Sequence, residues 1–99
     1  MRIISKKRLR KYWEKHAQAK EPLLFWYDVA KKAQWQTIAD AKQDFAHADA
    51  VGACTVFNIG GNSFRLITKI KYRYQIIYIR VVLTHAEYDK GDWKNDCGS

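Results

Sequence analysis

The stretch FRLITKIKYRYQIIYIRVVL, residues 64–83, decides the fold of this chain. It contains two runs rich in β-branched and aromatic residues, 64–72 and 75–83, separated by Arg73 and Tyr74. Runs of this kind on either side of a short break are typical of strands joined by a tight turn. The stretch therefore predicts an antiparallel hairpin that turns at Arg73 and Tyr74.

The alternation of residue types in the two runs predicts how the strands pair. Even positions of the first run and odd positions of the second are mostly apolar. Successive side chains of a strand point to opposite faces. With Arg73 and Tyr74 as the turn, the numbers of paired residues sum to 147, and in this register the apolar residues of both strands lie on the same face. The expected core pairs are Ile70 with Ile77, Leu66 with Val81, and Phe64 with Leu83. The opposite face then carries, with no acid among them, Arg65, Lys69, Lys71, Tyr78 and Arg80.

A further strand, Cys54–Ile59, precedes this hairpin. The glycines at 60–61 follow it and predict a two-residue turn, since glycine accepts the positive φ that such turns need. Across this turn the expected pairs are Asn58 with Ser63 and Val56 with Arg65. Asn58 would therefore lie on the basic face.

The first half of the chain has helical periodicity. A short strand at Arg2–Ile4 comes first, and Ser5 is a suitable cap for a helix that runs to about Ala19. A second helix has Pro22 in its first turn, and a third, shorter helix is expected at 38–45. After the last strand, the segment 85–90 predicts one more helical turn. The chain is expected to be a single domain, 1–99, with a loose tail after about residue 91.

The net charge of +8 is concentrated in two segments of the chain. Residues 1–20 hold eight basic side chains and one acid, and residues 54–84 hold five basic side chains and no acid. A basic surface attracts polyanions, of which nucleic acid is the commonest. No apolar run reaches the roughly 20 residues of a membrane helix, and no apolar stretch follows the basic N-terminus as in a secretory signal. We expect no membrane association and a cytoplasmic location, and hence a reduced state for Cys54 and Cys97.

Several kinds of catalytic site are disfavoured by the sequence. The three histidines have no second ligand at metal spacing, and no glycine loop carries the Lys-Ser/Thr of a phosphate-binding loop. We therefore expect neither a metal nor a cofactor. Metal-free phosphodiester cleavage is still open to a protein that acts on RNA, because the 2′-hydroxyl supplies the nucleophile. Tyr88 and His85 are candidates for the proton transfers, although capping or packing roles suit them as well.

The residues themselves resemble a known family. The segment VFNIGGNSFRLITKIKYRYQIIYIRVVLTHAEYDK, residues 56–90, is similar to the HigB-type toxins of bacterial toxin–antitoxin pairs, within the RelE/ParE superfamily. The F-N-x-x-G-N-x-x-R-L element at 57–66 and the T-H-x-E-Y-D element at 84–89 are its most specific parts. Similar segments at 10–16, 26–35 and 39–45 extend the resemblance over nearly the whole chain.

The resemblance implies an α+β fold, with helices on one face of a small antiparallel sheet, a short C-terminal helix and the other sheet face open. It also implies a ribosome-dependent mRNA endoribonuclease that cleaves translated message. The implied catalytic set is Arg65 and Arg80 on the scissile phosphate, Lys69 and Lys71 as supporting cations, and Tyr88 and His85 as acid–base candidates. The implied RNA-binding set is Asn58, Asn62, Tyr78, Lys6, Lys7 and Arg10.

The implied partners are mRNA on the ribosome and a HigA-type helix-turn-helix antitoxin, with operator DNA bound only through the toxin–antitoxin complex. The basic first helix suits contact with ribosomal RNA and contact with an acidic antitoxin segment equally. Two other functions stay open: an RNA- or ribosome-binding module without chemistry, and a ParE-like toxin that acts on DNA gyrase. A purely structural partner of an acidic protein is a further alternative.

Overall fold

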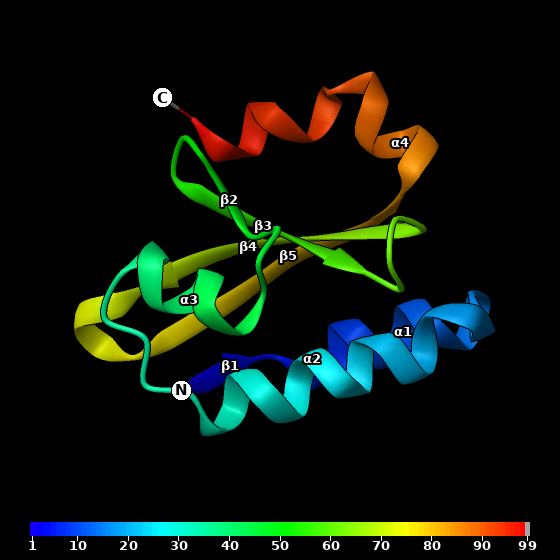
Figure 1. Cartoon of the computed structure of the whole chain (residues 1–99). Coiled ribbons are helices and arrows are strands. Elements are labelled where there is room, and N and C mark those ends of the chain that lie inside the picture. Colours follow the sequence, from blue (N-terminus) through cyan, green and yellow to red (C-terminus); the bar gives the residue numbers. More distant parts are fainter. Residues whose placement is uncertain (99) are drawn as a thin grey trace.

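The computed structural model describes residues 1–98, which fold into four α-helices and a five-stranded sheet (Figure 1). In chain order the elements are β1 (Arg2–Ile4), α1 (Lys6–Lys15), α2 (Lys20–Lys32), α3 (Ile38–Asp44), β2 (Asp49–Val51), β3 (Cys54–Ile59), β4 (Phe64–Lys71), β5 (Ile76–Thr84) and α4 (His85–Lys90). Short 3₁₀ helices span Ala17–Ala19, Tyr72–Tyr74 and Asp92–Cys97.

The sheet has the strand order β1-β5-β4-β3-β2. Strand β1 is parallel to β5, and the other neighbours are antiparallel. The α+β class predicted from the sequence is confirmed. The parallel edge was not predicted, because a three-residue strand carries no pattern that sets its direction.

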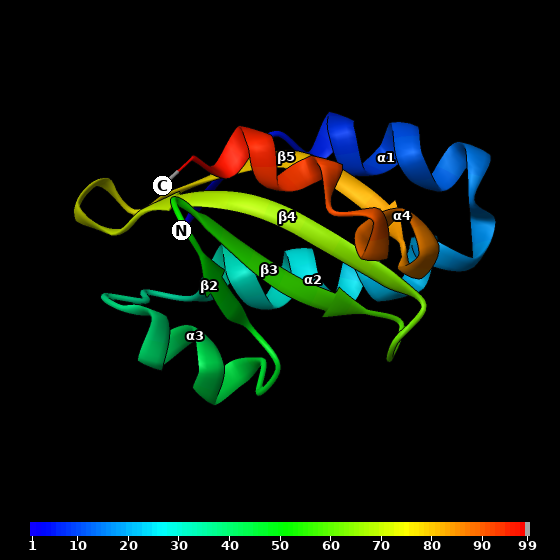
Figure 2. The same ribbon diagram turned by 90° about the horizontal axis from the view of Figure 1, so that it is seen from above.

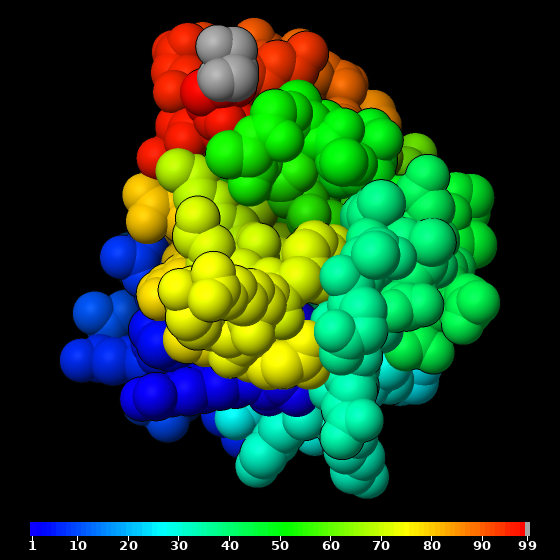
Figure 3. Space-filling view, turned by 90° about the vertical axis from the view of Figure 1, so that its left-hand side faces the viewer, coloured from blue at the N-terminus to red at the C-terminus, as the bar shows by residue number. Residues whose placement is uncertain are grey.

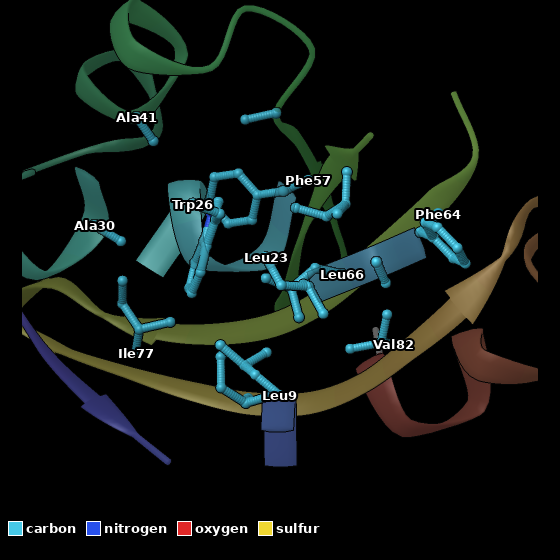
Figure 4. Close-up of a cluster of buried hydrophobic side chains, with 14 of the residues drawn as sticks. Leu9, Leu23, Trp26, Ala30, Ala41, Phe57, Phe64, Leu66, Ile77 and Val82 are labelled. Carbon is cyan, nitrogen blue, oxygen red and sulfur yellow. The ribbon is translucent and has the colours of Figure 1, made fainter. Parts of the chain in front are cut away.

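Helices α1 and α2 cover one face of the sheet, called here the helix face (Figures 1 and 4). Leu9 of α1 and Leu23 and Trp26 of α2 are fully buried there against Phe57 and Leu66. Apolar residues recurring once per helical turn produce this packing, as the sequence predicted. Helix α1 ends at Lys15 rather than near Ala19, because the backbone of His16 leaves the helical conformation before the following 3₁₀ turn.

The pairing of β4 with β5 agrees with the predicted register over only half of its length. Ile70 lies opposite Ile77 and Lys69 opposite Tyr78, as expected. The register then shifts by one residue between Ile67 and Thr68, so that Leu66 pairs with Val82 and Phe64 with Thr84. The predicted partners Val81 and Leu83 are wrong.

The register shift reverses which side chains of β5 face the core. Val82 is 6% exposed against the helices, whereas Val81 is 38% exposed. A β-bulge adds one residue to a strand and so inverts the alternation beyond it. The sequence did not reveal the bulge, because residues 81–83 are apolar at both odd and even positions.

The β3–β4 turn is two residues longer than predicted. Residues 60–63 form a four-residue connection with positive φ at Gly60 and Gly61, and Asn58 pairs with Arg65 rather than with Ser63. The expected pairing of Val56 with Arg65 is likewise wrong, since Val56 lies opposite Ile67. A shift of two residues preserves the face, so the predicted side of the sheet is still right for these residues.

The second face of the sheet is not open. The segment Asp92–Cys97, called here the strap, crosses it on the side opposite α1 and α2 (Figures 1 and 2). Trp93 is 8% exposed and Cys97 is 1% exposed, and both pack with Val56 and Ile67. The expectation of a loose tail after residue 91 is therefore wrong within residues 1–98. We call this side of the sheet the strap face.

The two cysteines form a disulfide, so the expectation of reduced thiols is wrong in this structure. Cys54 begins β3 and Cys97 ends the strap, with their Cα atoms 5.1 Å apart. The backbone N–H of Ala53 donates to the Cys97 carbonyl at 2.8 Å beside the bond. Figure 3 shows this end of the strap lying against the β2–β3 turn. The two cysteines are 43 positions apart in sequence, and they come together only because the strap crosses the sheet, which was not predicted.

Candidate active site

Arg65 of β4 is the centre of the candidate site on the strap face. Its guanidinium donates from Nη1 to the carbonyl oxygens of Asn62 and Phe64, both at 3.1 Å, and from Nη2 to the side-chain oxygen of Asn62. The residue is only 7% exposed, and no carboxylate within residues 1–98 forms a salt bridge with it. Buried cations are normally paired with an acid. Arg65 is therefore held rigidly by neutral acceptors while its positive charge stays free to attract an anion.

The ring of Tyr88 lies over this guanidinium, with the Arg65 Cζ atom 5.1 Å from the ring centroid. Tyr88 also stacks on Trp93 of the strap at 4.9 Å, and the Trp93 indole N–H donates to the Tyr88 carbonyl at 2.9 Å. Contacts on the ring and on the backbone fix the position of Tyr88. The structure thus brings together three residues from the two most specific sequence elements: Asn62, Arg65 and Tyr88.

Helix α4, which carries Tyr88, begins with a capping box. The Glu87 backbone N–H donates to the Thr84 hydroxyl at 3.2 Å, and the Glu87 carboxylate accepts from the Thr84 backbone N–H at 2.9 Å. The hydrogen bond from the Thr84 backbone is the largest cause of a lowered pKa at Glu87. This reciprocal pair satisfies two N–H groups that a helix start would otherwise leave unpaired, and so fixes where α4 leaves the sheet.

Arg80 and Lys69 form a second cationic group on the same face. Arg80 donates to both carboxylate oxygens of Asp96 in the strap, from Nε at 2.8 Å and from Nη2 at 3.0 Å. The Lys69 ammonium lies 3.8 Å from the same carboxylate. The hydrogen bond from Arg80 lowers the pKa of Asp96, and the same contact raises the pKa of Arg80. A guanidinium fork that grips a carboxylate in this way is equally suited to a phosphate.

The remaining predicted residues lie around these two groups. Asn58 is half-buried opposite Arg65, and Tyr78 is half-buried opposite Lys69. His85 is exposed at the start of α4, with its Nδ1 atom 3.0 Å from Asp89. Lys71 is exposed at the far end of β4, six residues and so about 20 Å along the strand from Arg65. The structure does not bring Lys71 into either group.

Of the three α1 residues in the implied RNA-binding set, Lys6, Lys7 and Arg10, none lines the groove beside Arg80. Lys6 lies over the Tyr27 ring at 4.9 Å, while Lys7 and Arg10 are exposed elsewhere on the helix. A groove of about 830 Å³ between α1 and β5 is lined instead by Arg8, Lys11, Lys15, His16 and Arg80, together with the acid Glu14. Arg8 also donates to the Arg80 carbonyl at 3.1 Å. The signal for this stripe is in the sequence, because positions 8, 11 and 15 share one helical face.

The His, Cys, Asp and Glu side chains of residues 1–98 form no group of three or more that could hold a metal ion. In the same part of the chain, no helix has the length and apolar character needed to cross a membrane.

Comparison with known proteins identifies the family. Residues 19–91 match the family model described as HigB_toxin, RelE-like toxic component of a toxin-antitoxin system. This chain belongs to the HigB toxin family. The resemblance drawn from the sequence motifs is thereby confirmed, and the matched region contains all of the candidate site except the strap and the groove residues of α1.

Curated relatives of this HigB-family chain carry consistent names. It is 33% identical over 92 residues to the mRNA interferase toxin HigB of Escherichia coli strain K12, covering 90% of this chain and 88% of the relative. The mRNA interferase HigB of Shigella flexneri matches to the same extent. The mRNA interferase HigB of Escherichia coli O6:H1 is 28% identical over 93 residues, covering 91% of this chain and 90% of the relative.

Proposed function

We propose that this chain is the toxin of a toxin–antitoxin pair and acts as a metal-independent endoribonuclease on mRNA bound to the ribosome. The observation that carries the proposal is Arg65, a buried cation that forms no salt bridge with any acid among residues 1–98 and lies under the Tyr88 ring. The names of the curated relatives support the same activity.

The proposed reaction uses the 2′-hydroxyl of the RNA as nucleophile. A bond forms between the 2′-oxygen and phosphorus while the bond from phosphorus to the 5′-oxygen breaks, leaving a 2′,3′-cyclic phosphate and a 5′-hydroxyl. One proton passes from the 2′-hydroxyl to a general base, and one passes from a general acid to the departing 5′-oxygen, so that the reaction consumes no proton overall. Arg65 stabilises the charge that develops on the phosphoryl oxygens, because its fork is already fixed before substrate binds.

Tyr88 is the proposed proton donor to the 5′-oxygen, since its ring is in contact with Arg65 and its phenol can ionise. His85 is a second acid–base candidate, one helical turn before Tyr88. Asn58 and Asn62 would contact the sugar or base, and Tyr78 would offer its ring to a base. Arg80 and Lys69 would bind the phosphate next to the scissile one. Lys71 would contact RNA only farther along the strand.

The proposed partners rest on the charge distribution and on the family to which the chain belongs. The groove cations Arg8, Lys11 and Lys15, with the exposed Lys6, Lys7 and Arg10, give α1 a basic surface suited to ribosomal RNA or to an acidic segment of the antitoxin. We propose a helix-turn-helix antitoxin of the HigA type as cognate partner. Operator DNA would be bound only by the complex, and the proposed location is the cytoplasm.

A cell-free translation reaction containing a reductant tests the proposal. Purified protein should create new 5′ ends within translated codons, mapped by primer extension, and these ends should require ribosomes. Arg65→Ala should abolish them, and Asp28→Asn, which changes an exposed acid on α2, should not. Intact message in the presence of folded protein would overturn the proposal.

Two further measurements separate the alternatives. A binding module without chemistry would lose affinity and translation inhibition in equal proportion in Arg65→Ala, whereas an enzyme loses turnover far more than affinity. A toxin that acts on gyrase would leave message intact and inhibit DNA supercoiling.

A further inference from the structure

The strap occupies the part of the site that is best suited to a second phosphate. Asp96 accepts two hydrogen bonds from Arg80 and lies 3.8 Å from Lys69. A carboxylate held by a guanidinium fork has the charge and the planar pair of oxygens that a phosphate would present. A phosphate of RNA that used Arg80 and Lys69 would have to displace Asp96 from them.

The strap is attached to the sheet at both ends. Trp93 packs under Tyr88 at its start, and Cys97 at its end is covalently bonded to Cys54 of β3. Asp96 directly precedes the bonded cysteine. The disulfide therefore keeps the carboxylate beside Arg80 at a high effective concentration, which the exposed ion pair alone would not maintain.

The backbone around the disulfide is closely fitted. Gly52, with φ +57°, faces the carbonyl oxygens of Cys97 and Gly98, and a Cβ atom at this position would overlap them. The Ala53 N–H donates to the Cys97 carbonyl. The backbone of the β2–β3 turn is therefore closely fitted to residues 97–98 at the end of the strap.

We propose that the strap is a redox-controlled inhibitor of this HigB-family chain, which the Cys54–Cys97 disulfide holds on the Arg80–Lys69 phosphate site. A dithiol reductant transfers two electrons and two protons, so that the disulfide becomes two cysteine thiols and the reductant becomes its own disulfide. Residues 94–97 then leave the face, while Trp93 stays packed against Tyr88. The reduced protein binds RNA more tightly than the oxidised protein. This inference rests on the proposed function for the identity of the ligand.

Binding is measured with a single-stranded RNA oligonucleotide that carries 2′-O-methyl groups and cannot be cleaved. Reduction of the wild type by dithiothreitol should strengthen binding about tenfold, because the oxidised protein has its site open only a small fraction of the time. Thiol alkylation followed by mass spectrometry reports the state of the cysteines in each sample. Free thiols in protein purified in air would overturn the proposal, as would equal affinities of the two states.

Three variants separate the carboxylate from the covalent bond. Oxidised Asp96→Asn should bind RNA as tightly as the reduced wild type. Asp92→Asn is the matched control, because it removes the same charge from the same strap without contacting Arg80 or Lys69, and it should bind like the oxidised wild type. The double variant Cys54→Ser/Cys97→Ser should bind tightly whether or not reductant is present. If the double variant does not fold, Asp96→Asn still decides the matter.

Cleavage measured in parallel distinguishes the two proposals. Message cleaved equally by oxidised and reduced protein would overturn the strap proposal and leave the nuclease intact. A redox-dependent affinity without cleavage in any sample would overturn the nuclease and support the strap.

Discussion

Arg65 is held by acceptors that balance none of its charge: two backbone carbonyls, one amide oxygen and the face of an aromatic ring. The sequence indicated Arg65, Asn62 and Tyr88 individually, through strand alternation and family motifs. It did not indicate that they touch, because Tyr88 reaches Arg65 only through the exit angle of α4. Asp96 was not predicted at all, since nothing in the sequence placed residue 96 on the strap face.

Tyr88→Phe tests the proton-donor role at the residue scale. The variant retains the ring over Arg65 and the stack on Trp93 but loses the hydroxyl, so RNA affinity and stability should be unchanged. The turnover rate in the translation reaction should fall about 10²- to 10⁴-fold, the usual contribution of a positioned general acid. An unchanged turnover rate would assign the proton transfer to another group, with His85 the next to substitute.

Strand β5 shows, at the element scale, where strand alternation predicts a sheet and where it fails. Up to Ile79 each second residue is buried, and the predicted pairs Ile70–Ile77 and Lys69–Tyr78 are present. At Arg80 the bulge changes the side on which every later residue lies. Residues 81–83 are all apolar, so the sequence there has no alternation that would reveal the bulge. Alternating polar and apolar residues would have revealed it.

The bulge predicts very different losses of stability for substitutions at two adjacent valines. Val82→Ala should lower the free energy of unfolding by about 2 kcal/mol, because it removes buried methyl groups from the helix-face core. Val81→Ala is the matched control and should change it by less than about 0.5 kcal/mol. Chemical denaturation of both variants measures the difference. A larger loss of unfolding free energy in Val81→Ala than in Val82→Ala would support the register without a bulge.

The capping box of α4 makes a pH-dependent contribution to stability. The pKa of Glu87 is lowered on folding, so the carboxylate stabilises the fold fully above its unfolded pKa near 4.5 and loses that effect as the pH falls through the lower folded value. Glu87→Gln, which keeps an acceptor oxygen but no charge, should be less stable than wild type at pH 7. At pH 3 the difference in unfolding free energy between wild type and Glu87→Gln should be smaller. An equal difference at pH 3 and pH 7 would contradict this prediction.

The hydroxyl of the same box is tested separately. Thr84→Ala removes the acceptor for the Glu87 backbone N–H and should cost about 1 kcal/mol in chemical denaturation. Because α4 positions Tyr88, the variant should also reduce turnover at temperatures well below its unfolding transition. Loss of stability with full turnover would show that Tyr88 is positioned by Trp93 alone.

At the scale of the whole molecule, the positive charge extends from the strap face across Arg80 to the groove beside α1. The sequence predicted two basic segments but could not show that Arg80 of the second segment lies beside the first, because that depends on how α1 packs on β5. If about four phosphates are contacted, affinity for single-stranded RNA should fall roughly 50-fold between 50 and 200 mM salt. Lys11→Ala/Lys15→Ala should flatten this dependence, and an unchanged slope would place the RNA outside the groove.

The bond between Cys54 and Cys97 also closes a ring in the chain. Every proposed catalytic side chain lies inside this ring, whereas α1, α2 and α3 lie outside it. A protease cut anywhere between the two cysteines therefore leaves the oxidised protein as one covalent molecule, which separates into two pieces only when the bond is reduced. In the oxidised toxin the two fragments of a cut catalytic segment would stay covalently joined, whereas the same cut would leave the reduced form as two separate chains.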